Sequence, residues 1–303
     1  MVENWLSFIW RILLKLLIGV NAGGWSQKLL SFANENKVEI NQVKLTLPRL
    51  DTQFNGYRLV QISDIHIGTW INRQRLLEAI RLINDQQPDL VAITGDFVTL
   101  DPEEYANDMI TAFCRISSRD GTVAVLGNHD HWAGKHEIRR ILNASGVNEL
   151  RNSICTLRRG EAQLHIAGVD SSYIGFDRLD RVLGELPAEG AAILLAHEPD
   201  FADTSAKSGR FDLQLSGHTH GGQIRLPRLG PPFLPRHGRK YSIGYNRVGE
   251  MHLYTNRGLG TGKVQLRLNC RPEITVFTLQ AANGKEPPSL IVSDSQPSDN
   301  PGM

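Results

Sequence analysis

The sequence predicts an α/β fold, and three observations lead to this prediction. Between residues 38 and 142, short apolar runs alternate with segments whose apolar residues recur at helical spacing. From residue 154 onward the apolar runs are mostly short and strand-like. Polar clusters follow five of the apolar runs, which is typical of ligand-binding residues at the carboxyl ends of strands.

The composition is that of an ordinary folded protein. The 303 residues include 33 Lys and Arg against 32 Asp and Glu, a formal net charge of +1, and 41% are hydrophobic. This balance gives no global reason to expect nucleic acid as a partner. Cys114, Cys155 and Cys270 are far apart and form no CxxC pair, so the sequence indicates neither a disulfide framework nor a cysteine-based zinc site.

Residues 1–25 are predicted to form an amphipathic helix that associates with a membrane. The stretch from Trp5 to Val20 is almost wholly apolar, and Arg11 and Lys15 lie on one side of it at helical spacing. A helix of about 16 residues is roughly 24 Å long, which is shorter than the roughly 30 Å hydrocarbon core of a bilayer. A cleaved signal peptide, a tilted membrane-spanning anchor and a helix packed on the protein's own core are the alternatives.

One globular domain is predicted over residues 36–280. A strand over 38–47 comes first, followed by strands at 59–62, 89–94 and 122–126 and helices at 72–86, 102–116 and 137–142. Further strands are predicted at 154–157, 163–169, 191–196, 211–215, 251–255 and 274–279. Residues 281–303 are rich in Pro, Ser, Asn and Asp and are predicted to be a disordered tail.

Five polar motifs occur in order along this domain. They are Asp64-Ile65-His66, Gly95-Asp96, Gly127-Asn128-His129-Asp130, His197 and Gly217-His218-Thr219-His220. Each motif alone is weak evidence, because a single buried histidine usually only satisfies a hydrogen bond. Since all five are expected at strand ends, we expect them to converge on one crevice. Carboxylates and imidazoles together suit divalent ions such as manganese, iron and zinc.

The motifs are compatible with a pair of metal ions. Asp96, a lone carboxylate after a glycine, could bridge the two, and Asn128 would be a neutral ligand. The glycines beside Asp96, Asn128 and His218 permit tight turns and a close approach of the backbone to a ligand. Two metal ions can supply a nucleophile and hold the attacking and leaving oxygens of a phosphoryl group.

At these motifs the chain resembles the calcineurin-like metallophosphoesterase superfamily, from Tyr57 to about Leu279. The resemblance implies a four-layer sandwich in which two facing mixed β-sheets are flanked by helices. It also implies two divalent metal ions and a role for His129 in contacting the phosphoryl group and assisting departure of the leaving group. The implied ligands are Asp64, His66, Asp96 and His220 for one ion, and Asp96, Asn128, His197 and His218 for the other.

The segments after two of the motifs distinguish branches of this superfamily. Ser/Thr protein phosphatases continue their Gly-Asp motif with Val-Asp-Arg-Gly, whereas this chain has Phe97-Val98-Thr99, which argues against a protein substrate. The same difference makes Asp130 the candidate for orienting His129. Residues 217–223, 256–260 and 272–275 look like the bacterial branch of membrane-associated phosphodiesterases, some of which hydrolyse UDP-diacylglucosamine in lipid A synthesis.

The segment that follows His220 is locally basic and also carries apolar residues such as Leu229 and Phe233, which could contact a lipid. Our hypothesis is that Arg236, Arg239 and Lys240 bind the substrate's phosphates, because arginine and lysine suit phosphate oxygens. A solvated surface loop is the alternative interpretation.

The sequence thus predicts a dinuclear metal-dependent phosphodiesterase or pyrophosphatase. Its substrate could be lipid-linked, such as UDP-diacylglucosamine, and its location peripheral, on the cytoplasmic face of a bacterial inner membrane. A soluble nucleotide phosphodiesterase or nuclease is the second hypothesis. A non-catalytic scaffold is the third, although such a protein should have lost ligands and every expected position is filled.

Overall fold

The structure is a computed structural model that describes residues 37–262, 264–282 and 290–294. The predicted membrane helix of residues 1–25 lies outside these residues. Within the described part of the chain, no helix combines the length and apolar character needed to cross a bilayer.

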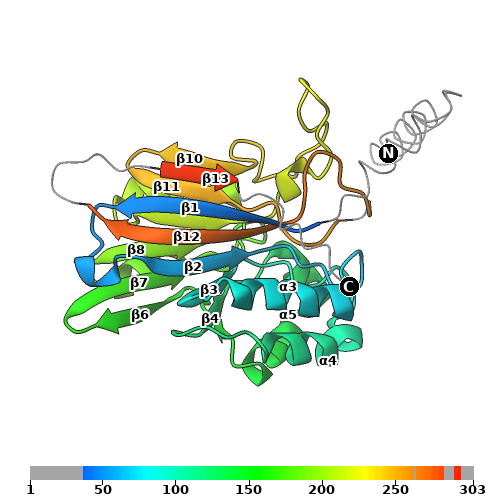
Figure 1. Cartoon of the computed structure of the whole chain (residues 1–303), viewed down its shortest axis with the longest axis horizontal. Helices are drawn as coiled ribbons and strands as arrows, with labels where there is room; N and C mark the ends of the chain where they lie inside the picture. Colours follow the sequence, from blue (N-terminus) through cyan, green and yellow to red (C-terminus); the bar gives the residue numbers. More distant parts are fainter. Residues whose placement is uncertain (1–36, 263, 283–289, 295–303) are drawn as a thin grey trace, which may run out of the picture. The chain divides into compact units, whose positions relative to one another are not determined.

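The first of two mixed β-sheets contains seven strands in the order β13-β1-β12-β2-β3-β4-β5 (Figure 1). The strands β2 to β5 are parallel, β12 is antiparallel to β2, and β1 is parallel to β12. Their bounds are Glu39–Leu47 for β1, Tyr57–Ile62 for β2, Leu90–Ile93 for β3, Thr122–Ala124 for β4, Asn148–Glu149 for β5 and Glu273–Ala281 for β12.

The second sheet contains six strands in the order β10-β11-β9-β8-β7-β6. Its four inner strands are parallel, and β6 and β10 run antiparallel to them at the two edges. The bounds are Ser153–Arg159 for β6, Ala162–Gly168 for β7, Ala191–Leu195 for β8, Leu213–Ser216 for β9, Gly244–Val248 for β10 and Met251–Thr255 for β11.

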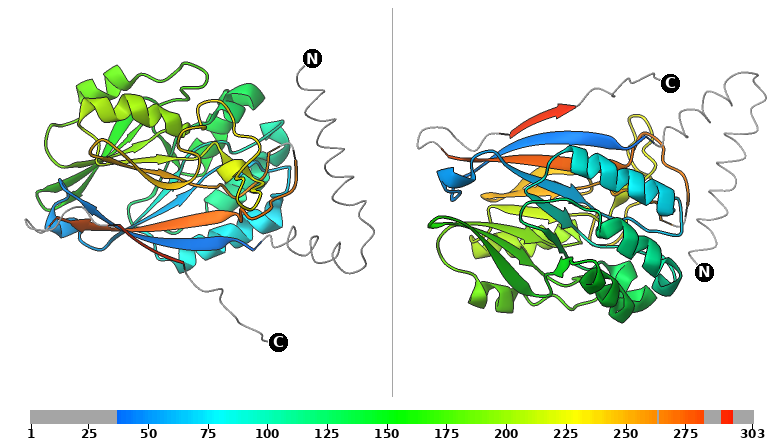
Figure 2. Two further views of the ribbon diagram at one scale, coloured as in Figure 1. Left: turned by 90° about the horizontal axis from the view of Figure 1, so that it is seen from above. Right: turned by 60° about the horizontal axis from the view of Figure 1, so that its bottom comes forward.

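Helices lie on both outer faces of the sheet pair, so the prediction of two facing mixed sheets flanked by helices is confirmed (Figure 2). The longer helices pack on the first sheet and the shorter ones on the second. The bounds are Arg73–Asp85 for α3, Pro102–Phe113 for α4, Asn128–Ala144 for α5, Leu179–Glu185 for α6 and Ala202–Ser205 for α7, with 3-10 turns at Thr52–Phe54 (η1), Pro199–Phe201 (η2), Ala206–Ser208 (η3) and His220–Gly222 (η4).

Three buried apolar clusters fill the spaces between these layers. The middle cluster joins the two sheets, with Leu59 and Leu90 from one side and Ile193 and Leu215 from the other. All four residues of β3 are buried, as expected for a parallel strand covered on both faces. The side chain of Gln61 donates to the Ser216 carbonyl oxygen at 2.9 Å and ties the end of β2 to the end of β9. This link fixes the carboxyl ends of strands from the two sheets side by side.

The first helical turn of α5 was missed by the sequence prediction, which began this helix at residue 137. The helix begins at Asn128, because the carboxylate of Asp130 accepts a hydrogen bond from the Gly127 backbone N–H at 2.9 Å and caps it. Gly134, at φ 143° and ψ 73°, then interrupts the helix, which is why helical spacing is visible only beyond it.

The predicted disordered tail of residues 281–303 needs correction at Leu290–Asp294. These residues form β13, which pairs antiparallel with β1, so that Val292 lies opposite Val43. The edge of β1 offers unpaired backbone groups, and an apolar Leu-Ile-Val run has high strand propensity, so pairing outweighs the polar composition around it.

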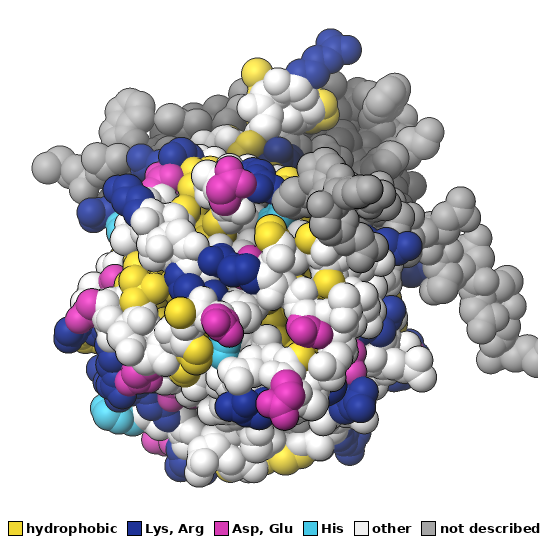
Figure 3. All heavy atoms as spheres, turned by 90° about the vertical axis from the view of Figure 1, so that its left-hand side faces the viewer, with side chains coloured by type: hydrophobic (Ala, Val, Ile, Leu, Met, Phe, Trp, Pro, Cys, Tyr) yellow, Lys and Arg dark blue, Asp and Glu magenta, His cyan; other side chains and the backbone are white. Residues whose placement is uncertain are grey.

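Charged side chains are mixed on the face that Figure 3 shows, the left-hand side of Figure 1. Lys and Arg alternate there with Asp and Glu over the surface and build no continuous basic field. This face therefore lacks the one-signed surface that a nucleic-acid backbone attracts.

Candidate metal centre

The turn after β2 carries Asp64 and His66. The backbone N–H of Asp64 donates to the Gly95 carbonyl at 2.9 Å, and that of His66 donates to the Asp96 carbonyl at 3.1 Å. Backbone hydrogen bonds therefore join the turn after β2 to the turn after β3. This arrangement brings Asp64, His66 and Asp96 to one edge of the first sheet.

Asp96 lies at the middle of the site. Its Oδ2 atom is 3.1 Å from Nε2 of His197 and 3.6 Å from Nε2 of His66, while its Oδ1 accepts the backbone N–H of His129 at 2.9 Å. A Cβ atom on Gly127 would collide with the Asp96 carboxylate, so the absence of a side chain at Gly127 lets this carboxylate lie against the start of α5.

Asp130 does not orient His129, contrary to our interpretation of the sequence. Its carboxylate accepts the backbone N–H groups of Asp96 at 2.9 Å and Phe97 at 2.8 Å, in addition to that of Gly127. Asp130 is fully buried and fixes the turn that holds Asp96 against the start of α5. The His129 ring instead lies edge-on to the rings of His66 and Trp132, with centroids 4.8 and 5.0 Å apart.

The second sheet supplies three histidines from the ends of β8 and β9. His197 Nδ1 lies 2.6 Å from the Thr94 carbonyl oxygen, and His218 Nε2 lies 2.8 Å from the Arg236 carbonyl oxygen. A carbonyl oxygen can only accept, so these two ring nitrogens carry the hydrogens. The other nitrogens, Nε2 of His197 and Nδ1 of His218, are left with lone pairs for a ligand when the rings are neutral.

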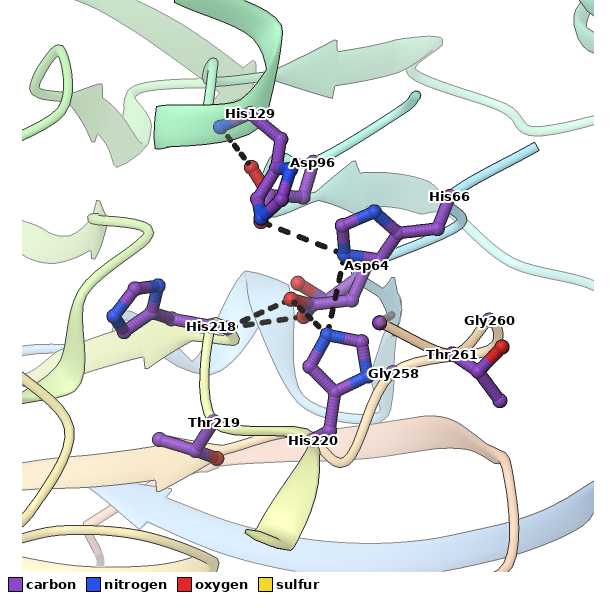
Figure 4. A network of polar contacts seen from close by, with 12 residues as sticks. Asp64, His66, Asp96, His129, His218, Thr219, His220, Gly258, Gly260 and Thr261 are labelled. Carbon is purple, nitrogen blue, oxygen red and sulfur yellow. Dashed lines mark hydrogen bonds and ion pairs between the residues drawn. The ribbon is translucent and has the colours of Figure 1, made fainter. Parts of the chain in front are cut away.

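The seven predicted ligands are buried or nearly so, and we call them the metal cage. Six of them belong to groups whose ligand atoms lie close together, and Figure 4 shows five, namely Asp64, His66, Asp96, His218 and His220. His66 and His220 face each other with their Nε2 atoms 3.1 Å apart, and Oδ1 of Asp64 lies 3.4 Å from His220 Nε2. Three groups have ligand atoms within 4.8 Å of one another, namely Asp64 with His66 and His220, His66 with Asp96 and His129, and Asp96 with His197 and His218.

Five cage residues have a left-handed backbone. Their φ angles are 47° at Asp64, 44° at His66, 58° at Asp96, 72° at His218 and 52° at His220. Only eleven non-glycine residues of the described chain have a positive φ, so nearly half lie in this one site. Such conformations cost of order 1 kcal/mol or more each and cluster where function requires them. The strain is therefore independent evidence that this cluster is a functional site.

The electrostatics of the cage keep Asp96 charged and the His66 and His220 rings neutral, but they differ at His197. Burial alone would lower the pKa of His197, yet the adjacent Asp96 raises it well above its usual value. Burial alone would raise the pKa of Asp96, but the adjacent His197 holds it well below its usual value. Burial raises the pKa of Asp64 to about 6, against the opposing effect of His197. Burial lowers the pKa of His66 to about 3 and that of His220 well below its usual value, so both rings keep lone pairs for a metal.

The residues present fit divalent metal ions. They combine carboxylate, imidazole and amide oxygen donors, the mixture that borderline divalent ions accept. The Oδ1 atom of Asn128 is buried without a hydrogen-bond partner among the described atoms. Buried polar atoms without partners are rare in folded proteins, and a metal ion would satisfy this one.

The predicted phosphate-binding side chains are less well placed. Lys240 Nζ donates to both oxygens of the Asp203 carboxylate, at 2.7 and 2.8 Å, so its charge already has a partner. The backbone N–H of Arg239 donates to Asp200. Arg236 is exposed, and its carbonyl oxygen holds His218, which makes it the member of the trio that is tied directly to the cage.

Three groups around the cage were missed by the sequence prediction. Thr99 Oγ1 lies 2.8 Å from His66 Nδ1 and fixes that ring. The buried guanidinium of Arg267 donates to the carbonyl oxygens of Gly258 and Gly260, whose loop packs behind Asp64. Glu198, directly after His197, was also missed. Only Thr99 had a signal in the sequence, since it follows the Gly-Asp motif closely.

Comparisons with known proteins agree with this geometry. The family model described as Calcineurin-like phosphoesterase matches residues 57–222. The chain is 33% identical over 272 residues to "Uncharacterized metallophosphoesterase YkuE" of Bacillus subtilis (strain 168), covering 88% of this chain and 94% of that protein. It is 32% identical over 229 residues to "Phosphodiesterase YaeI" of Escherichia coli (strain K12), covering 74% of this chain and 82% of that protein.

A vertebrate relative is more distant. The "Transmembrane protein with metallophosphoesterase domain" of Danio rerio is 30% identical over 257 residues, which cover 80% of this chain and 58% of that protein.

Proposed function

The chain belongs to the calcineurin-like phosphoesterase family and is a metal-dependent phosphoester hydrolase, and we propose that it cleaves phosphodiester or diphosphate bonds with two divalent metal ions. The observation that carries this proposal is the convergence of donor residues from two sheets into three adjacent ligand groups, two of which share Asp96 and two of which share His66.

Each metal ion would have its own set of ligands. Asp64, His66, Asp96 and His220 would hold one ion, and Asp96, Asn128, His197 and His218 would hold the other. Once bound, a divalent pair lowers the pKa of water and offsets the negative charge of the phosphoryl oxygens. Manganese, iron and zinc are the candidate ions.

His129 is proposed as the general acid. Its backbone N–H is anchored on Asp96, and its ring lies against His66 at the side of the cage where Trp132 is exposed. From this place a protonated imidazole would donate its proton to the oxygen that leaves phosphorus. General-acid catalysis of this kind contributes roughly 100-fold or more to a rate.

The test is hydrolysis of bis(p-nitrophenyl) phosphate by the full-length protein. Activity should appear on addition of manganese, iron or zinc and stop on addition of EDTA. A panel of monoesters, diesters and diphosphates, run with each metal, then identifies the bond that is cleaved fastest. Failure of a metal-loaded protein to hydrolyse any member of this panel would contradict the proposal.

A lipid-linked diphosphate such as UDP-diacylglucosamine is the second candidate substrate, with the protein lying on the cytoplasmic face of a bacterial inner membrane. Two observations favour it. The apolar stretch of residues 5–20 has the pattern of an interfacial helix. Leu229 and Phe233, at 82% and 60% exposure, project from the basic segment after His220. Residues 283–289 and 295–303, which lie outside the described residues, are still proposed to be disordered.

Membrane association has its own test. The full-length protein should co-sediment with vesicles of anionic phospholipid, and a variant that lacks residues 1–25 should not. Both proteins should be assayed on UDP-diacylglucosamine in the same vesicles. Absence of co-sedimentation and of UDP-diacylglucosamine hydrolysis in both proteins would favour a soluble nucleotide phosphodiesterase instead.

A further inference from the structure

Beside the metal cage lie two aromatic side chains, the exposed Trp132 and the half-buried Tyr173, which we call the aromatic rim. Trp132 is 58% exposed, although tryptophan is usually largely buried. Its ring centroid is 5.0 Å from that of His129 and 5.6 Å from that of Tyr173. Tyr173 in turn lies 5.8 Å from His218. The rim therefore connects the proposed general acid to a cage histidine.

We propose that the aromatic rim stacks on the planar base of a nucleoside phosphodiester or nucleoside diphosphate substrate. This inference rests on the proposed function and deepens it by naming the chemical class of one substituent on phosphorus. Trp132 and Tyr173 play no part in holding the metal ions, so their surface is available to the group that lies next to the phosphate.

The rim is held in place from both sides. Trp132 belongs to the first turn of α5, which Asp130 caps and which Gly134 separates from the rest of the helix. On the other side, Glu198 is buried and accepts hydrogen bonds from the Ser171 hydroxyl at 2.5 Å and from the Ser172 backbone N–H at 2.9 Å. This carboxylate fixes the turn that leads into Tyr173.

The placement of Glu198 joins the rim to the chemistry. Glu198 directly follows His197 in the chain, so the residue next to a proposed metal ligand also anchors the Tyr173 turn. An aromatic surface that is fixed before binding loses little conformational freedom when a base stacks on it. Stacking of one base on an aromatic side chain contributes about 1–3 kcal/mol.

A planar base fits the rim better than an alkyl chain does. Trp and Tyr rings prefer steep or offset contacts with other π systems, and the rim rings already meet at an interplanar angle of 84°. The exposed aliphatic side chain Leu229 belongs to a different segment, after His220, where an alkyl chain would find apolar contact. The two kinds of substituent would therefore use different parts of the surface.

The experiment measures equilibrium binding to the manganese-loaded, full-length protein by calorimetry. The three probes each carry one phosphate monoester: thymidine 5′-phosphate, 2-deoxyribose 5-phosphate, which lacks the base, and octyl phosphate. We expect the wild-type protein to bind thymidine 5′-phosphate more tightly than the other two. Trp132→Leu should weaken thymidine 5′-phosphate binding about tenfold, within the range of one stacked base, and change the other two less than twofold.

Trp132→Phe is the second variant, which keeps an aromatic ring at the same place. It should retain thymidine 5′-phosphate affinity within about threefold of wild type, since a phenyl ring still stacks. Metal content, measured in each variant, should equal that of the wild type. Phe176→Ala, an exposed aromatic residue that contacts His131 rather than the cage, is the matched control and should leave all three affinities unchanged.

The outcomes separate this inference from the proposed function. An unchanged affinity ratio between thymidine 5′-phosphate and 2-deoxyribose 5-phosphate in Trp132→Leu would overturn the inference, whatever the enzyme hydrolyses. A loss of octyl phosphate binding in the same variant would overturn it as well and assign the rim to an alkyl chain. Hydrolysis of bis(p-nitrophenyl) phosphate, measured separately, tests the proposed function alone.

Discussion

The metal cage and the surface around it are built on different physical rules. Every cage histidine and carboxylate is buried or nearly so, and five of the seven residues have a strained backbone that the two sheets hold in place. Exposed side chains surround the cage, and a charged one such as Lys240 forms an ion pair with a neighbouring residue, Asp203. The comparison teaches that the cage is specified by the fold, whereas the surface is free to vary with the substrate.

Replacing the shared carboxylate should give the largest effect. Asp96→Asn removes the charge that both proposed metal ions require and leaves His197 and His66 without their anionic neighbour. Because loss of a group that only orients a metal ligand already weakens binding by about 10–100-fold, we expect a loss of metal affinity above about 100-fold. Metal content after dialysis measures this. If the variant retains two equivalents of manganese, Asp96 is not required for metal binding, and the cage does not differ from the surface in the way described.

Replacing His129 should separate catalysis from metal binding. In His129→Ala the proton donor is lost while all seven cage residues remain, so kcat on bis(p-nitrophenyl) phosphate should fall about 100-fold. Metal content should stay at the wild-type value. An equal loss of bound metal would instead make His129 a ligand, which its position near His66 and Asp96 also permits.

Thr99→Val should give a smaller effect, and it tests whether a residue that only contacts a cage histidine also supports metal binding. It removes the partner of His66 Nδ1, and we expect about a tenfold loss of metal affinity with an unchanged fold. Thr156→Val is a matched control, because Thr156 Oγ1 makes the same contact with His165 Nδ1 at 2.9 Å, outside the cage. If both variants bind metal equally well, the Thr99 contact is only structural.

The basic side chains should give the smallest effects. Arg236→Ala is expected to raise the KM for a diphosphate substrate about threefold, in the range of one exposed charge contact. Lys240→Ala should change it by less than about twofold, because the Lys240 ammonium is already paired with Asp203. The reverse order would show that the Lys240 pair opens when substrate binds.

The proximity of the cage residues could be predicted from the sequence because most of them follow strand ends. Asp64, Asp96 and His197 each follow a buried apolar strand within three residues, and such strands are readable from apolar runs alone. The fold class followed from the same runs together with the family resemblance. The role of Asp130 was not readable, because its partners are backbone N–H groups more than thirty residues away as well as nearby.

The sequence did not predict the aromatic rim or strand β13, and the reasons are related. Trp132 and Tyr173 become neighbours only when α5 and the turn after β7 meet, and their separation in the sequence shows no pattern. The strand β13 has a short apolar run in a polar context, and its pairing depends on the free edge of β1. Both features are products of tertiary contact rather than of local propensity.

The place of β12 in the first sheet has a consequence for synthesis on the ribosome. This strand lies between β1 and β2, which precede it by some two hundred residues, and the loop behind Asp64 is also contributed from beyond residue 256. A nascent chain therefore exposes the flanks of β1 and β2 until almost the whole domain has emerged. We therefore expect metal ions to bind mainly after translation, since the loop behind Asp64 is among the last parts of the domain to be synthesised.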